Sequence, residues 1–265
     1  MITSPANPTI KQIRKLRERK ERQQSGSFYL EGLHIVGEAV TLNWPLETLI
    51  YAPERMTSIF GRQTVDAFIA KGGSVLEVSG AVFDSLSEKD GPQGLAAVAK
   101  QRWSALDNIA PAGGDLWIAL DSVADPGNLG TIMRTCDSVG GKGVMLLDQS
   151  TDPYDPSAVR GSMGALFACQ LVRCNFPEFS AWKRAVNIPV IGTSDKAAQD
   201  YHSYPYPDPF VLLMGSERQG LQEMHLNLCD AVVAIPMLGR SDSLNLAVAT
   251  ALVAYEAYNH HRDQR

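Results

Sequence analysis

Apolar residues recur along the chain with two different spacings, and these predict strands that alternate with helices. Between residues 28 and 99, short apolar runs predict strands, while apolar positions three or four apart predict helices. The pattern predicts a small α/β sandwich of about 70 residues, within the size range of a minor domain. Its predicted strands are Phe28–Leu30, Leu46–Tyr51, Val75–Val78 and Gly94–Val98, and its predicted helices are His34–Leu42 and Ile59–Lys71.

A second α/β region follows residues 101–114, which end in Pro-Ala-Gly-Gly and are predicted to be a linker. Nearly continuous apolar strands alternate there with helices, which is typical of a parallel sheet covered on both faces. The predicted strands are Leu116–Leu120, Gly143–Leu147, Gln170–Val172, Pro189–Ile191, Phe210–Met214 and Ala231–Ile235, and a long helix is predicted from Asn245 to about His260. The predicted division is a basic arm (1–24), a first domain (25–100), the linker (101–114) and a second domain (115–265).

Charge is distributed unevenly between the N-terminus and the rest of the chain. The whole chain has a net charge of −5, but residues 1–22 hold seven Lys or Arg and two Asp or Glu. The segment Pro8–Gln24 has helical spacing, with Ile10, Ile13 and Leu16 apolar and basic residues at most other positions. A basic arm on an acidic body indicates a polyanionic partner. The alternative is that the basic residues only form a solvated helix face.

Composition excludes several classes of protein. Hydrophobic residues make up 45% and charged residues 20% of the chain, which is typical of a globular protein. No apolar run is long enough to span a membrane and Met1–Arg22 lacks a signal-peptide core, so we expect a cytoplasmic protein without membrane association. The four cysteines form no CxxC pair, so we expect buried thiols and no metal site.

Three polar segments follow predicted strands of the second domain, where open α/β sheets bind ligands. The first contains Asn128 and Arg134, an amide and a guanidinium suited to a phosphate or a ribose, although an N-cap and a surface arginine would look the same. The second, Gly215-Ser-Glu-Arg-Gln-Gly-Leu221, places Glu217 at a strand end. The third holds Ser243 and Asn245, and Ser243 also stands where the N-cap of the long helix is expected.

Together these segments resemble the motifs of SpoU-type (TrmH-like) RNA ribose methyltransferases of the SPOUT superfamily. The patterns N(x)G(x)₃R at 128–134, GSE(x)₂GL at 215–221 and IPM(x)G(x)₃SLN at 235–245 stand in the family's order and spacing. Residues 152–165 resemble the family's second helix region, and residues 28–32 resemble the start of its substrate-binding domain, which is similar to ribosomal protein L30e. The resemblance covers nearly the whole chain.

The resemblance implies a fold and a reaction. It implies a small L30e-like α/β domain followed by a SPOUT α/β domain with a C-terminal trefoil knot, and a homodimer that completes the site. It implies that S-adenosylmethionine donates a methyl group to a ribose 2′-hydroxyl in structured RNA, with 23S ribosomal RNA favoured over transfer RNA. Arg134 would activate the hydroxyl or stabilise the developing alkoxide.

The same resemblance assigns roles to individual residues. The predicted catalytic residues are Asn128, Arg134, Glu217, Ser243 and Asn245; the predicted cofactor-binding residues are Thr193, Gly215, Ile235, Met237 and Leu244. The predicted RNA-binding residues are Lys11, Arg14, Lys15, Arg160 and Arg218. No metal is expected, because a sulfonium is already a strong methyl donor.

Two other classes of protein also fit the sequence. A catalytically silent RNA-binding module would need only the basic arm and the first domain. A Rossmann-type methyltransferase would also fit the strand pattern, but no GxGxxG motif follows the first strand of the second domain.

Overall fold

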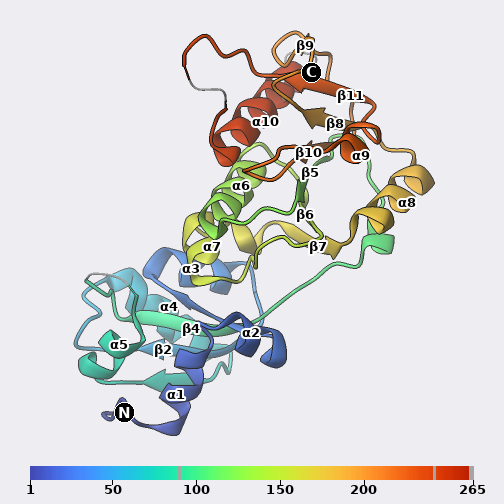
Figure 1. Ribbon diagram of the computed structural model, residues 1–265. Helices are drawn as coiled ribbons and strands as arrows, with labels where there is room; N and C mark the ends of the chain where they lie inside the picture. Colours follow the sequence, from blue (N-terminus) through green and yellow to red (C-terminus); the bar gives the residue numbers. More distant parts are fainter. Residues whose placement is uncertain (89–90, 241–242, 263–265) are drawn as a thin grey trace. The chain divides into compact units, whose positions relative to one another are not determined.

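The computed structural model describes residues 1–88, 91–240 and 243–262 (Figure 1). The chain forms two compact units, residues 1–101 with 152–167, and residues 102–151 with 168–265. Segment 152–167, expected in the second domain, thus packs with the first unit. Elsewhere the unit boundary falls at Gln101, the start of the predicted linker.

The first unit is built on a four-stranded sheet in the order β1-β4-β2-β3. β4 runs antiparallel to both of its neighbours, whereas β2 and β3 are parallel. Each predicted strand is present, but α5 was not predicted from the sequence. The elements are β1 (Ser27–Glu31), α3 (Leu33–Thr41), β2 (Leu46–Tyr51), α4 (Ile59–Ala70), β3 (Val75–Glu77), α5 (Gly80–Leu86) and β4 (Leu95–Lys100).

The basic arm is part of the core of this unit. Ile10, Ile13 and Leu16 are buried in one cluster with residues of β1, β2, β4 and α5. The prediction of one continuous helix is wrong, because α1 (Pro8–Lys15) ends before α2 (Arg19–Ser25) begins. The Arg22 guanidinium donates to the carbonyls of Leu16 and Arg17, so a cation binds the oxygens that the end of α1 leaves without a helical partner.

Arg22 also fixes segment 152–167 to the first unit. Its side chain is 1% exposed and pairs with Asp152 at 2.8 Å and with Asp155 at 3.2 Å. Beside it the Phe28 and Tyr154 rings lie 4.7 Å apart, and α7 (Pro156–Ser162) begins at the Asp155 N-cap. A buried cation with two carboxylates is the physical reason why this segment belongs with α1 and α2.

The second unit contains a seven-stranded sheet in the order β7-β6-β5-β10-β8-β11-β9. All of its pairings are parallel, as the apolar strand pattern predicted, so the α/β class is confirmed. The strands are β5 (Leu116–Asp121), β6 (Gly143–Leu147), β7 (Gln170–Cys174), β8 (Val190–Thr193), β9 (Gln199–Asp200), β10 (Phe210–Met214) and β11 (Ala231–Ala234). β9 has only two residues and gives no sequence signal.

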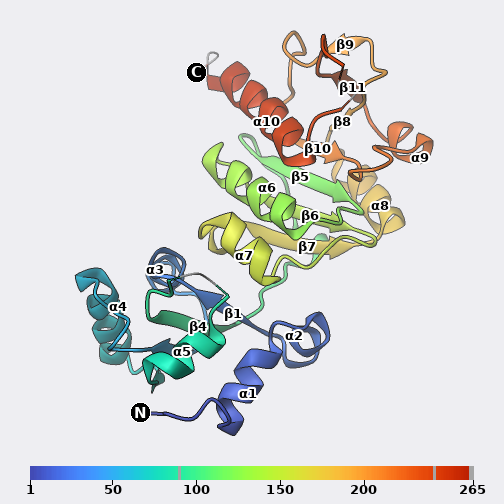
Figure 2. The same cartoon turned by 60° about the vertical axis from the view of Figure 1, so that its left-hand side comes forward.

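Helices cover both faces of this sheet (Figure 2). Phe176, Phe179 and Trp182 of α8 (Phe176–Val186) pack against alternate residues of β5, β6, β7, β8 and β10. On the other face, α6 (Pro126–Ser138) and α10 (Leu246–Arg262) lie side by side. The short α9 (Glu223–Leu226) connects β10 to β11. The trefoil knot implied by the resemblance stays a prediction.

Among the described residues, no helix is both long and apolar enough to cross a membrane.

Candidate active site

The start of α6 follows the carboxyl end of β5, an interior strand of the sheet. Asp125 is the N-cap, and its carboxylate accepts from the Asn128 backbone N–H at 2.7 Å, while Pro126 occupies the first helical turn. The helix therefore begins two residues earlier than a start at Asn128 would require. Asn128 lies in the first turn and is half-buried.

The loop after β10 turns back tightly on itself. The Gly220 N–H donates to the Ser216 carbonyl at 3.0 Å, and Gly220 has a φ of +62°, in the left-handed region that favours glycine. A Cβ at Gly215 would collide with the backbone of Gly220 and Leu221. Gly215 is thus required by the close approach of the loop's own backbone, and its predicted cofactor contact remains a prediction.

Glu217, at the tip of this loop, binds the start of α6. Its carboxylate accepts from the N–H groups of Ala124 at 3.0 Å and Asp125 at 3.1 Å, and from the Asn128 side-chain amide at 3.2 Å. Partial burial alone would raise the pKa of this carboxyl. Hydrogen bonds from Ala124, its own backbone N–H, Asp125 and Asn128 outweigh burial, so the Glu217 pKa lies below its usual value.

Asn128 joins the first and third motifs. Its Oδ1 accepts from Nδ2 of Asn245 at 2.9 Å, while its Nδ2 donates to Glu217. The Asn245 Oδ1 in turn accepts from the backbone N–H groups of Ala247 and Val248. Asn245, rather than the expected Ser243, therefore caps the long helix α10. Ser243 is exposed and lies two residues before this cap.

Arg134 lies outside this network. It is exposed on α6, and within residues 1–88, 91–240 and 243–262 no hydrogen bond or ion pair holds its guanidinium. Six residues along a helix turn through one full turn plus about 240°, which leaves Arg134 and Asn128 about 120° apart around the helix axis. The two side chains therefore project in different directions. Three predicted catalytic residues, Asn128, Glu217 and Asn245, are therefore brought together, and Arg134 is not joined to them within one chain.

The predicted cofactor residues follow three adjacent parallel strands. β10, β8 and β11 are neighbours in the sheet, and Gly215, Thr193 and Ile235 stand at or just after their carboxyl ends. The Thr193 hydroxyl donates to the Met214 sulfur at 3.5 Å. Ile235 and Met237 are half-buried and Leu244 is exposed. Apolar side chains and close-packed backbone at one sheet edge suit an adenine ring, so these residues would hold S-adenosylmethionine.

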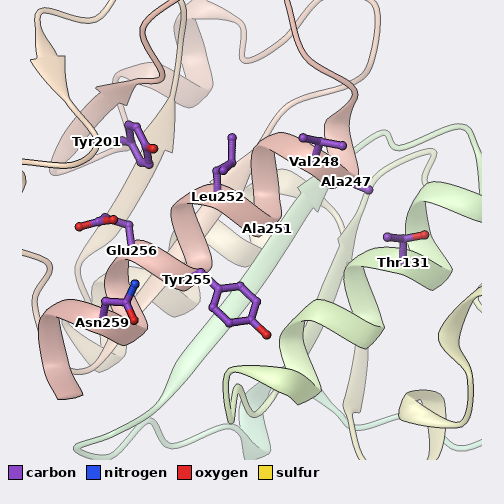
Figure 3. Close-up of a pocket in the computed structure, with 9 residues that line it drawn as sticks. All are labelled: Thr131, Tyr201, Ala247, Val248, Ala251, Leu252, Tyr255, Glu256 and Asn259. Atoms are coloured by element: carbon purple, nitrogen blue, oxygen red, sulfur yellow. The ribbon is translucent and has the colours of Figure 1, made fainter.

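A groove of about 440 Å³ lies between α6 and α10 (Figure 3). Its lining is mostly apolar side chains of α10 together with one residue of α6 and one that follows β9. The lining residues are Thr131, Tyr201, Ala247, Val248, Ala251, Leu252, Tyr255, Glu256 and Asn259. The predicted cofactor-binding residues are not part of this lining, so the groove is separate from the predicted cofactor site.

The residues predicted to bind RNA have different surroundings. Lys11 and Lys15 are exposed on α1, and Arg160 is exposed at the end of α7. Arg14 is half-buried and donates to the Ser85 hydroxyl at 2.9 Å, so part of its hydrogen-bonding capacity is already used. Arg218 is exposed beside Glu217.

Sequence reasoning missed several groups that shape the site. The N–H groups of Ala124 and Asp125, which hold Glu217, were signalled only by the Asp-Pro-Gly turn before α6. Asp121 and His225 are buried behind the Glu217 loop, and no motif marks them.

Comparison with known proteins identifies both parts of the chain. The model of the SpoU rRNA Methylase family matches residues 115–255, and that of an MRM3-like substrate binding domain matches residues 7–97. A 23S rRNA (uridine(2479)-2′-O)-methyltransferase from Streptomyces viridochromogenes is 32% identical, over 91% of this chain and 86% of that protein. The 23S rRNA (guanosine(2553)-2′-O)-methyltransferase RlmP of Bacillus subtilis is 29% identical, over 96% and 97%.

Solved structures agree. The chain is similar to an AdoMet-bound rRNA methyltransferase from Sinorhizobium meliloti, with a TM-score of 0.89, 40% identity and coverage of 98% of this chain and 97% of that one. The resemblance inferred from the three motifs is thereby confirmed. The chain belongs to the SpoU rRNA methylase family.

Proposed function

We propose that this protein transfers a methyl group from S-adenosylmethionine to a ribose 2′-hydroxyl of 23S ribosomal RNA. The observation that carries the proposal is the hydrogen-bonded series Glu217–Asn128–Asn245, which joins the three family motifs beside the predicted cofactor site. Relatives that act on 23S rRNA align with nearly the full chain. A ribosomal RNA substrate is consistent with the cytoplasmic location expected from the sequence.

Methyl transfer requires that the ribose is oriented and that the charge developing on its 2′-oxygen is stabilised. Bound S-adenosylmethionine would supply a methyl group on a positively charged sulfur. As the ribose oxygen forms the new C–O bond, the C–S bond would break, the sulfur would leave as a neutral thioether, and the proton of the hydroxyl would pass to solvent. Glu217, Asn128 and Asn245 hold the three loops in one arrangement, so the site does not have to be ordered during the reaction. In this proposal the fixed amides and the carboxylate orient the ribose.

Arg134 contributes its charge in this proposal. A guanidinium does not readily lose its proton in a protein, so it is a poor general base. It can bind the phosphate next to the target ribose and stabilise the negative charge that develops on the 2′-oxygen. Arg134 is exposed, and the described residues form no hydrogen bond or ion pair with its guanidinium. It is therefore available to RNA.

We further propose that two chains form a homodimer through the groove between α6 and α10. Val248, Leu252 and Tyr255 recur at helical spacing along α10 and are 49%, 38% and 44% exposed. Thr131 of α6 lines the same groove and precedes Arg134 by one helical turn (Figure 3). A second copy on this face would place Arg134 at the interface, which supports a site shared between protomers.

Mixing two inactive variants tests the shared site. Arg134→Ala and Glu217→Ala chains are each expected to be inactive as homodimers. If Arg134 of one protomer serves the other's site, random reassociation gives mixed dimers with one intact site, and about a quarter of wild-type activity returns. No recovery from a mixture shown to exchange subunits would overturn the shared site. A wild-type monomer with full activity would overturn the dimer.

Methylation of purified RNA tests the substrate. Unmodified 23S rRNA and a pool of unmodified transfer RNA are incubated with enzyme and methyl-labelled S-adenosylmethionine. Label in 23S rRNA at one position supports the proposal. Label confined to transfer RNA would make the protein a transfer RNA methyltransferase, and binding of both RNAs without any transfer would identify a silent RNA-binding module.

A further inference from the structure

A buried serine contacts the loop that joins β5 to α6. Ser150 follows β6, the neighbour of β5 in the sheet, and is 4% exposed. Its hydroxyl oxygen accepts the backbone N–H of Val123 at 3.2 Å. Its single hydroxyl proton faces two carbonyl oxygens, that of Leu147 at 2.8 Å and that of Leu120 at 3.1 Å. One side chain therefore binds the chain on both sides of Ser122.

Ser122 has a backbone conformation that few residues adopt. Its φ is +53°, in the left-handed region that is unfavourable for residues other than glycine. Such a conformation persists where the surrounding structure fixes it. Here the segment after β6 does so, because Thr151 donates its N–H to the Val123 carbonyl at 2.8 Å. The Ser150 hydroxyl adds the contacts on either side of the turn.

The turn at Ser122 sets the direction of the N–H groups that come next in the chain. Those of Ala124 and Asp125 both donate to the Glu217 carboxylate, at 3.0 Å and 3.1 Å. Two successive N–H groups converge on one carboxylate only while the backbone before them keeps its conformation. Partial burial would raise the pKa of Glu217, and the hydrogen bonds to its carboxylate, that from Ala124 foremost, outweigh burial.

We infer that Ser150 is a positioning residue for methyl transfer: it holds the turn at Ser122 and thereby places the N–H groups that bind Glu217. This inference rests on the proposed function, since it takes Glu217 and Asn128 as part of the reacting site. Val123 is fully buried, so without the Ser150 hydroxyl its N–H loses an acceptor that water does not replace. The turn then relaxes, and the geometry at Glu217 changes with it.

The first test compares Ser150→Ala with wild type in single-turnover methylation of 23S rRNA at saturating S-adenosylmethionine. Methyl transfer should fall about tenfold, the size of effect expected when a buried N–H is left unpaired. Affinity for S-adenosylmethionine, measured by calorimetry, should stay close to that of wild type, because the predicted cofactor residues lie on or after β8, β10 and β11. The control is Ser180→Ala, a buried serine of α8 whose hydroxyl accepts from Arg184 at 2.7 Å. It should change neither quantity.

The pKa of Glu217 separates positioning from a general loss of stability. It is measured by NMR titration of the isotope-labelled carboxyl group in folded protein. In Ser150→Ala this pKa should rise toward the ordinary glutamate value, because displaced N–H groups no longer favour the ionised form. In Ser180→Ala it should not move. Ser150→Cys, of similar shape but with a weaker donor and acceptor, should lie between wild type and Ser150→Ala in both rate and pKa.

The outcomes distinguish this inference from the proposed function. A wild-type rate in Ser150→Ala, a Glu217 pKa that does not move, or a loss of rate accounted for by weaker cofactor binding would overturn the role of Ser150. Each of these leaves the proposed function intact, because wild type still methylates 23S rRNA. Wild type that transfers no methyl group would overturn both.

Discussion

Asn128 and Asn245 lie 117 positions apart in the sequence, yet their side-chain amides form a hydrogen bond of 2.9 Å. In each side-chain amide, both the oxygen and the nitrogen form hydrogen bonds. Asn128 also donates to Glu217, and Asn245 also caps α10. A single pair of side chains therefore connects the β10 loop, the start of α6 and the start of α10, which are the three segments that carry the family motifs.

Replacing Asn128 should damage catalysis more than stability. Asn128→Ala removes the connection between Glu217 and Asn245, and we expect methyl transfer to fall at least about tenfold, since two hydrogen bonds at about 1 kcal/mol each are lost. Asn128→Asp should be worse, because it sets a second carboxylate against Glu217. Single-turnover methylation measures the effect. Asn227→Ala, an exposed asparagine after α9, is the matched control, and equal rates in all variants would contradict the role of Asn128.

Glu217 should make the stability of the second unit depend on pH. Its pKa in the folded protein is lowered, so its contribution is fully present above the ordinary glutamate pKa and is lost as the pH falls through the folded value. The difference in melting temperature between wild type and Glu217→Gln should be largest near neutral pH and shrink in acid. The exposed Glu223→Gln serves as control. A difference that is constant with pH would show that the charge of Glu217 is not involved.

The arm shows what the sequence could and could not predict. The spacing of Ile10, Ile13 and Leu16 correctly indicated a helix with an apolar stripe, and most strands were placed within one or two residues. The sequence did not show that Arg22 turns inward, because its carboxylate partners Asp152 and Asp155 lie 130 and 133 positions away. Likewise, the three motifs predicted Asn128, Glu217 and Asn245, while the pair Asp121 and His225, which no motif joins, was visible only in the fold.

Arg22 should be needed for the first unit to fold. Arg22→Met leaves the buried carboxylate of Asp152 without its cation, and breaking a buried pair on one side costs about 3–5 kcal/mol. Urea denaturation measures the loss. Lys20→Ala, exposed on the same helix, should change little. The double change Arg22→Met with Asp152→Leu should recover part of the loss, and a single variant as stable as wild type would contradict this account.

The exposed lysines of α1 should govern RNA affinity and its dependence on salt. Deleting the arm would not test this, because Ile10, Ile13 and Leu16 belong to the core. Lys11→Gln and Lys15→Gln keep these residues, and each should weaken binding and reduce the salt slope by about 1 for each lost phosphate contact. The methylated position should not change, since phosphate contacts carry little sequence information. Filter binding at several salt concentrations measures these slopes, with Lys71→Gln as control. Equal slopes in wild type, Lys11→Gln and Lys15→Gln would show that these lysines do not contact phosphates.

Above all, the protein is proposed to place the methyl group on a ribose oxygen. The most direct measurement is mass spectrometry of 23S rRNA treated with the enzyme, digested to nucleosides and fragmented at the glycosidic bond. We predict a single methylated nucleoside whose added mass stays with the ribose fragment, and its near disappearance with Arg134→Ala, because loss of one charged donor costs roughly a hundredfold. A methyl group that stays with the base fragment, or undiminished transfer by Arg134→Ala, would contradict the account.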